Sequence, residues 1–350
     1  MSVAHPPFQI AGQDIVAGNR VTLSISVPGQ SVYTPLAMPV HVVHGKRPGP
    51  VLFVSAAIHG DEINGIEVIR QLLKVRALSR LRGTLICVPI VNVYGFLNHT
   101  RYLPDRRDLN RVFPGAKHGS LASRMARVFA EEIIDRSTHG IDLHTGANNR
   151  TNLPHIRANL DDRDCESLAL IFGTPVVINA NLRDGSLRQY ALERGIPMLL
   201  YEAGEALRFQ RMAVRAGLRG ILNVMRALEM LPKRKTIGPK VPVVEARSSS
   251  WIRAPQTGLL RTDVRLGNRI KEEETLGHIA DALGENEAVV KAPFTGIVIG
   301  RNQLPVVNEG DALFHIARFS DSLSVEDAIE TFHETHIEGL ESGDYHEPLT

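Results

Sequence analysis

His59 and Glu62 lie three residues apart, directly after an uncharged apolar run at residues 51–57. The run is rich in β-branched side chains and bounded by Pro50 and Gly60, which predicts a buried strand. Imidazole nitrogens and carboxylate oxygens are both common zinc ligands. A catalytic zinc site needs a further protein ligand and an open position. The pair therefore predicts part of a metal site at a strand end.

Two later strand-like runs also end in residues that could do chemistry. Residues 140–146 form a short apolar run that contains His144 and ends in a glycine turn, and residues 197–201 lead directly into Glu202. In an open α/β sheet, ligands bind at the carboxyl ends of parallel strands. We therefore expect these strand ends to meet the His59 turn at one edge of the sheet.

Together these residues suggest a hydrolytic zinc centre. His59, Glu62 and His144 would bind the ion, which lowers the pKa of water toward about 7. Glu202 would be the general base that accepts the proton of the water and returns it to the leaving amine. Asp142 would hold the His144 ring in one tautomer, as carboxylates behind metal ligands do. Each residue alone has a structural explanation, such as a hydrogen-bonded histidine or, for Asp142, a buried acid that caps a turn.

A polar segment at residues 92–119 is long for a connection in a compact domain, and such loops are usually functional. It carries four arginines and an asparagine that suit an anionic substrate or an oxyanion, namely Arg101, Arg106, Arg107, Arg111 and Asn110. The structural alternative is a solvated loop in which Asp105 and Asp108 pair with the arginines.

The elements around these residues alternate between strands and helices. Apolar runs predict strands at 51–57, 84–91, 140–146, 175–180 and 197–201, and periodic spacing predicts helices at 63–81, 120–137, 166–173, 186–194 and 207–231. Half-exposed strands are expected within residues 1–46. A strand, a helix and a second strand joined by short turns predict a parallel βαβ unit.

Composition narrows the class of protein. The 350 residues are 43% hydrophobic with a net charge of +2, which suits a soluble globular protein and gives no electrostatic reason to expect nucleic acid. No apolar run is long enough for a transmembrane span, and the first residues do not resemble a signal peptide. Cys87 and Cys165, the two cysteines, give no disulfide framework. A cytoplasmic protein without membrane partners, and possibly a homo-oligomer, is expected.

A second domain follows a predicted linker at residues 233–241. The segment 252–260 matches 290–298, and 276–279 matches 313–316, so residues 242–318 predict an all-β barrel or sandwich of two half-repeats. The repeat resembles biotinyl/lipoyl half-motifs, but the hairpin between the halves has no modifiable lysine. A role in shaping the active-site mouth or an oligomer interface is favoured over a carrier role. Residues 319–350 form an acidic tail.

Four motifs in order carry a family resemblance: HGDE (59–62), DLNRVFPG (108–115), DLHTG (142–146) and EAG (202–204). They resemble the succinylglutamate desuccinylase/aspartoacylase family, a branch of the zinc carboxypeptidase-like hydrolases, over about residues 45–230. The resemblance implies one zinc ion per chain, on His59, Glu62 and His144, with Glu202 as base. It also implies that Asn110 and Arg111 hold the substrate carboxylate and that Arg101 polarises the scissile carbonyl, a role that Arg107 could take instead.

The sequence thus predicts a mixed, mostly parallel α/β catalytic domain at residues 1–235, with residues 1–46 as an N-terminal β extension and a smaller β domain after it. The expected reaction is zinc-dependent hydrolysis of the amide of a small N-acyl amino acid. A peptidase or esterase with the same site is one alternative. A non-catalytic binding or carrier protein is another.

Overall fold

The computed structural model describes residues 5–29, 35–147, 149–233, 243–319 and 322–341. The linker predicted at 233–241 lies almost wholly outside these ranges, as do the last residues of the predicted tail. No helix within the described ranges is long and apolar enough to cross a membrane.

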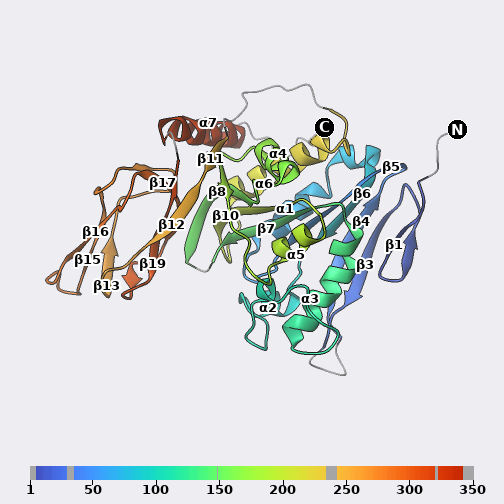
Figure 1. Ribbon diagram of the computed structural model, residues 1–350, viewed down its shortest axis with the longest axis horizontal. Helices are drawn as coiled ribbons and strands as arrows, with labels where there is room; N and C mark the ends of the chain where they lie inside the picture. Colours follow the sequence, from blue (N-terminus) through green and yellow to red (C-terminus); the bar gives the residue numbers. More distant parts are fainter. Residues whose placement is uncertain (1–4, 30–34, 148, 234–242, 320–321, 342–350) are drawn as a thin grey trace.

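A mixed sheet forms the centre of the molecule (Figure 1). Its strands are, in spatial order, β3 (Arg20–Ser26), β4 (Ala37–His44), β6 (Arg82–Val88), β5 (Arg47–Ala56), β7 (His139–Gly146), β10 (Met198–Glu205) and β8 (Arg150–Ala158). The four strands from β6 to β10 are parallel, β3 and β4 run antiparallel to their neighbours, and β8 runs antiparallel to β10. The parallel centre brings the carboxyl ends of β5, β7 and β10 to one edge.

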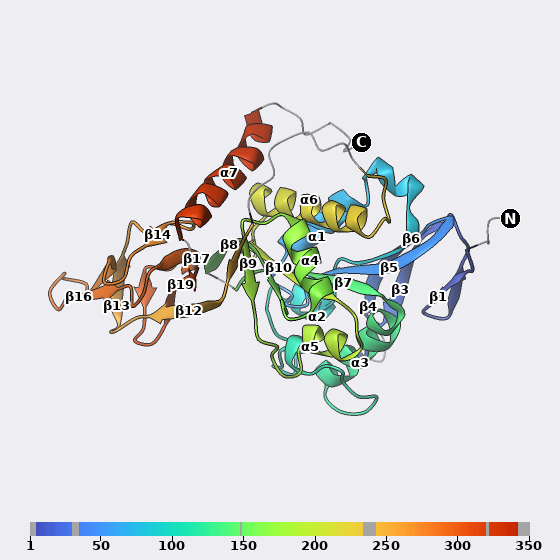
Figure 2. The ribbon, with the colours of Figure 1, turned by 45° about the horizontal axis from the view of Figure 1, so that its top comes forward.

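Helices cover both faces of this sheet (Figure 2). The helices α1 (Asn64–Leu72), α4 (Arg163–Phe172) and α6 (Arg211–Ala227) pack on one face, and α3 (Leu121–Glu132) and α5 (Leu187–Glu193) pack on the other. Helix α1 connects the parallel strands β5 and β6, which is the predicted βαβ unit. Each face has its own buried apolar cluster, so the sheet is buried on both sides at its centre.

Some predicted element bounds were wrong. The helix predicted over 63–81 ends at Leu72, and a 3₁₀ turn, Arg76–Arg80, completes the segment before β6. Gly83, which follows that segment, could be expected to end the helix as a C-terminal glycine, but it does not. It lies within β6 at φ 75°, where a Cβ would meet the carbonyl oxygen of Pro50 at 2.0 Å. The helix predicted over 207–231 is the shorter α6, and strand β8 had no sequence prediction. Pro154 inside β8 removes a ladder donor and obscures the strand pattern.

The C-terminal strands extend the central sheet (Figure 1). They are β11 (Val244–Ala246), β12 (Ser248–Arg253), β13 (Gly258–Arg261), β14 (Arg269–Ile270), β15 (Thr275–Ala280), β16 (Ala288–Lys291), β17 (Gly296–Asn302), β18 (Val306–Val307) and β19 (Ala312–Arg318). Strands β16, β15, β13 and β18 form a separate sheet, whereas β17 pairs with β8 and carries β19 and β12. An apolar cluster fills the space inside this C-terminal unit.

The remaining strands and helices lie at the borders of these sheets, except for the short helix α2 (Val93–Leu97) in the loop after β6. Strands β1 (Phe8–Ile10) and β2 (Gln13–Ile15) form a two-stranded sheet. Strand β9 (Val176–Asn179) pairs with β8 and β11. Helix α7 (Ser322–Glu341), within the predicted acidic tail, packs against α6 and the C-terminal strands.

Candidate active site

The first part of the site lies where β5 and β7 end. The chain leaves β5 at Ala56 and forms a turn that carries His59 and Glu62 before α1 begins. His144 projects from β7, the parallel neighbour of β5. All three side chains are almost completely buried. The fold therefore gathers residues that lie up to 85 positions apart in the chain (144 minus 59) at one sheet edge.

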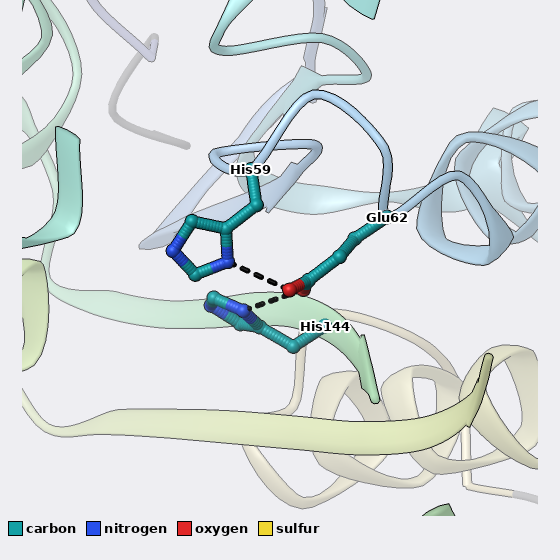
Figure 3. A group of neighbouring side chains, drawn as sticks. All are labelled: His59, Glu62 and His144. Atoms are coloured by element: carbon teal, nitrogen blue, oxygen red, sulfur yellow. Dashed lines mark hydrogen bonds and ion pairs between the residues drawn. The ribbon is translucent and has the colours of Figure 1, made fainter. Parts of the chain in front are cut away.

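Both imidazole rings are directed at the carboxylate of Glu62 (Figure 3). The Nδ1 atom of His59 is 2.8 Å from Oε1 of Glu62, and Nδ1 of His144 is 2.9 Å from Oε2. The backbone N–H of Thr145 also donates to Oε2, at 3.1 Å. One potential ligand atom from each residue lies within 4.8 Å of the other two, and among the described residues this is the one such group.

Each imidazole lies between two carboxylates. Glu62 faces Nδ1 of both rings, while Nε2 of His59 is 3.2 Å from Asp108 and Nε2 of His144 is 2.7 Å from Asp142. A neutral imidazole has one N–H and presents a lone pair on its other nitrogen. A carboxylate beside that lone pair is favourable only when the ring is protonated or a cation lies between them. The donor set of two imidazoles and one carboxylate thus fits a zinc ion.

The charges around the triad oppose the effect of burial on the pKa values. Burial alone would lower the pKa of His144, but Asp142 and Glu62 outweigh it and raise that pKa well above the usual value. Burial would raise the pKa of Glu62, but His59 and His144 hold it well below its usual range. The pKa of His59 is raised because Glu62 and Asp108 outweigh burial. Protons and a metal ion therefore compete for the same nitrogens.

Glu202 lies beside the triad on β10. Its position in the strand pairs with that of His144 on β7, and the pairing of β10 shifts immediately after it on both sides. Gly204 permits this bulge at φ 75°, where a Cβ would meet the side chain of Gln210 at 2.0 Å. Burial raises the pKa of Glu202, although His144 and a hydrogen bond from Asn152 oppose that effect. A half-buried carboxylate with a raised pKa in a cavity suits a general base.

Arg101 is the loop arginine that contacts the triad. Its guanidinium donates to Asp108 at 2.9 and 3.2 Å and to Glu62 at 3.2 Å, and Nη1 is 3.1 Å from Nδ1 of His59. A guanidinium only donates hydrogen bonds. The contact therefore places the lone pair of His59 on Nδ1 and its N–H toward Asp108. Arg107, the alternative to Arg101, is exposed and does not line the cavity.

Asn110 and Arg111 lie in a short 3₁₀ helix, Leu109–Arg111, and both line the cavity. The side-chain oxygen of Asn110 accepts from the backbone N–H of Leu187, so its amide nitrogen is the group that can donate to a ligand. The guanidinium of Arg111 donates to the backbone oxygen of Asn110. Both predicted residues of the substrate carboxylate site therefore lie beside the triad.

A cavity of about 240 Å³ opens in front of the triad and is rich in arginine. Its arginines are Arg101, Arg111, Arg150, Arg157, Arg183 and Arg188. Arg188 is only 8% exposed. One of its terminal nitrogens donates to the backbone of Asn181, and the other is buried without a hydrogen-bond partner among the described residues. Burial and the neighbouring Arg157 lower the pKa of Arg188 to about 10.

The C-terminal unit supplies another part of the cavity wall, namely Trp251 and His315. Their rings stack at 4.8 Å, and the guanidinium of Arg150 lies 5.2 Å from the Trp251 ring. Burial and Arg157 lower the pKa of His315 to about 3, so this ring is neutral near pH 7.

Sequence reasoning missed several residues of the site. Asp108 was considered only as a partner of loop arginines, because 49 residues separate it from His59. No sequence motif pointed to Asn152, Arg157 or Arg188. A signal for Arg188 was its place in the first turn of a predicted helix at 186–194, close to the strand that leads into Glu202. Trp251, the single tryptophan, was a further available signal.

Comparison with solved structures identifies the fold. A succinylglutamate desuccinylase/aspartoacylase from Rhodobacter sphaeroides superposes with a TM-score of 0.77 at 24% identity, covering 86% of this chain and 96% of that one. The product-bound ectoine utilization protein EutE (DoeB) from Ruegeria pomeroyi gives 0.78 at 20% identity, covering 91% and 99%. The α/β architecture is thus that of the desuccinylase/aspartoacylase structures.

Sequence comparison identifies the family. The family model described as the succinylglutamate desuccinylase/aspartoacylase catalytic domain matches residues 48–228, more than half of the chain. The protein belongs to this family of deacylases. A curated relative, the N-alpha-acetyl-L-2,4-diaminobutyric acid deacetylase of Halomonas elongata, is 27% identical over 306 residues, which are 84% of this chain and 89% of the relative.

Proposed function

We propose that this protein is a zinc-dependent hydrolase that cleaves the amide bond of an N-acyl amino acid and releases a carboxylate and a free amine. The observation that carries the proposal is the pairing of Glu202 with His144 across two parallel strands. This pairing puts a half-buried carboxylate next to a triad that suits a metal ion. Membership of the deacylase family supports the same reaction class.

The residues of the triad would hold the ion, and the other side chains would perform the remaining steps. A zinc ion bound there would lower the pKa of water and polarise the acyl carbonyl. Glu202 accepts a proton from the attacking water and passes it to the leaving nitrogen. Arg101 donates hydrogen bonds to the carbonyl oxygen as negative charge develops on it. Its contact with Asp108 holds the guanidinium in place for that role.

Asn110 and Arg111 would bind the carboxylate of the amino acid portion, since an amide N–H and a guanidinium both donate to it. The further arginines of the cavity favour a substrate with a second anionic group. Arg188 supports this point most directly, because its buried terminal nitrogen lacks a partner in the described part of the chain. The substrate in the name of the Halomonas elongata relative is instead an acylated diamino acid.

A hydrolysis screen tests the proposal. The panel contains N-acetyl and N-succinyl derivatives of acidic, neutral and cationic amino acids, including N-acetyl-2,4-diaminobutyric acid, together with dipeptides and esters. We expect zinc-dependent release of the amine, with the highest kcat/KM for acidic amino acids and loss of activity with a chelator. Preference for dipeptides or esters would instead indicate a peptidase or esterase. A protein that binds no zinc and is unchanged by Glu202→Gln would be non-catalytic.

A further inference from the structure

We infer that Asn152 is a positioning residue for Glu202 and that Gly300, from the C-terminal unit, sets where its amide lies. The inference rests on the proposed function, because it assigns Glu202 the role of general base. It goes beyond the proposed function because the C-terminal unit would help to position the base, in addition to lining the cavity.

Asn152 makes a direct contact with the base. Its Nδ2 donates a hydrogen bond to Oε2 of Glu202 at 2.9 Å, and both residues line the cavity. Hydrogen bonds to an ionised acceptor are about twice as strong as neutral ones. The contact engages one carboxylate oxygen of Glu202. The other oxygen, Oε1, is then the atom that is available to accept the proton from water.

Strand β8 places Asn152 between two units of the molecule. On one side its position pairs with Gly204 of β10, two residues after the base. On the other side it pairs with Gly300 of β17, a strand of the C-terminal unit. The pairings of β10 with β8 and of β17 with β19 both shift register beside this point. Bulges near active sites re-aim side chains, so these irregularities are consistent with a site built to direct Asn152.

Gly300 leaves room for the amide oxygen of Asn152. A Cβ at position 300 would lie 2.9 Å from that Oδ1 atom and 3.1 Å from Cβ of His315. The φ of Gly300 is not in the left-handed region, so an alanine fits the backbone. The closest atom belongs to the mobile end of a side chain. An added methyl group would therefore push the Asn152 amide first, and it would press less closely on Cβ of His315 in β19.

Displacement of the amide would turn the Glu202 carboxylate away from its working orientation. Misplacement of a reacting group by about 1 Å can reduce a rate by about 10²-fold. Neither Asn152 nor Gly300 contacts the metal-binding triad through a hydrogen bond of the described chain. The effect should consequently appear in kcat, while zinc content and KM stay near those of the wild type.

The experiment is a double-mutant cycle on the zinc-loaded, full-length protein with the best substrate of the screen. We expect Asn152→Ala to lower kcat by about 10–100-fold and Gly300→Ala to lower it less, with zinc content unchanged. In the Asn152→Ala background, Gly300→Ala should have almost no further effect, because it acts through the missing side chain. Asn152→Asp, which keeps the shape but loses the donor, should lower kcat at least as much as alanine.

Val290→Ala is the control for loss of stability in the C-terminal unit. Val290 is buried in the core of that unit, on a strand that does not pair with β8. We expect this variant to unfold at a lower temperature with an unchanged kcat. The inference is overturned if Asn152→Ala keeps the wild-type kcat. It is also overturned if Gly300→Ala causes the same fold loss in both backgrounds. A zinc-loaded wild type that hydrolyses no compound of the panel would instead overturn the proposed function itself.

Discussion

Glu202 and His144 are register partners on the parallel strands β10 and β7. Cross-strand partners direct their side chains to the same face of a sheet. Asp142 lies two residues before His144 and so shares that face. Ser55 of β5 is the register partner of Asp142, and its hydroxyl donates to that carboxylate at 2.7 Å. Ser55, Asp142, His144 and Glu202 thus lie on one face of the sheet, spread over the adjacent strands β5, β7 and β10.

Glu202→Gln should nearly abolish turnover without loss of the metal. The amide has almost the same shape but cannot accept a proton from water. General-base catalysis contributes about 10²–10⁴-fold, so kcat should fall by that factor. Zinc content and substrate binding should match the wild type. Glu193→Gln, on the exposed end of α5, is the matched control and should keep full activity. A Glu202→Gln enzyme with wild-type kcat would remove Glu202 from the reaction.

The strand-end residues could be predicted from the sequence because each follows a strong local pattern. The apolar run before His59 marks the end of β5, the run before Glu202 marks the last regular pairing of β10, and the parallel order of βαβ units brings these positions together. Asn152 and Asp108 could not be found in this way. Their roles depend on pairing across β8 and on the path of a long loop, and neither leaves a periodic signal. The bounds of α1 and α6 were wrong because tertiary packing, which local periodicity does not contain, decides where each helix ends.

The continuity of the central sheet with the C-terminal strands was likewise beyond the sequence. The internal repeat predicts a separate β unit, and an apolar cluster does fill that unit. The repeat does not indicate whether the edge strand of that unit pairs with another strand. In the structure β17 pairs with β8 through Gly300, Arg301 and Asn302. Long-range strand pairing is set by the whole fold, so a local motif search treats the two parts as independent.

Removal of the metal should abolish activity and lower stability. A ligand that binds only the folded state stabilises it by about 2.7 kcal/mol at a free concentration one hundred times its Kd. Chelator treatment should therefore lower Tm, and added zinc should restore both Tm and activity. Retention of zinc should fall as the pH drops through the raised pKa values of His59 and His144, since protons then occupy the ligand nitrogens. Measurement of the zinc content after dialysis at a series of pH values checks this pH dependence.

Replacement of Asp142 should lower the affinity for zinc more than it lowers kcat at saturating zinc. Asp142→Asn keeps the shape but removes the negative charge beside Nε2 of His144. Loss of such a partner typically costs 10–100-fold in metal affinity or activity, and we expect about that increase in zinc Kd. Excess zinc should recover most of the activity. Ser55→Ala removes one hydrogen bond to Asp142 and should have a smaller effect in the same direction. Unchanged zinc affinity in Asp142→Asn would show that His144 needs no such support.

Arg157 should set the pH at which Glu202 becomes active. Burial raises the pKa of Glu202, and the positive charge of Arg157 is one of the influences that lower it. The base works in its ionised form, so activity is present above this pKa and is lost as the pH falls through it. Arg157→Gln removes a charge that favours the carboxylate. The pKa of Glu202 should rise further, and the acid limb of the pH profile of kcat should move to higher pH.

The same pH profile separates the charge of Arg157 from its packing. Arg157→Lys keeps the positive charge, so its acid limb should stay close to that of the wild type. Arg163→Gln, at the exposed start of α4, removes an arginine that does not line the cavity and should leave the profile unchanged. All profiles are measured at saturating substrate and zinc, because the cavity arginines also face the substrate. An acid limb that moves to lower pH in Arg157→Gln would mean that the arginine does not stabilise the ionised base.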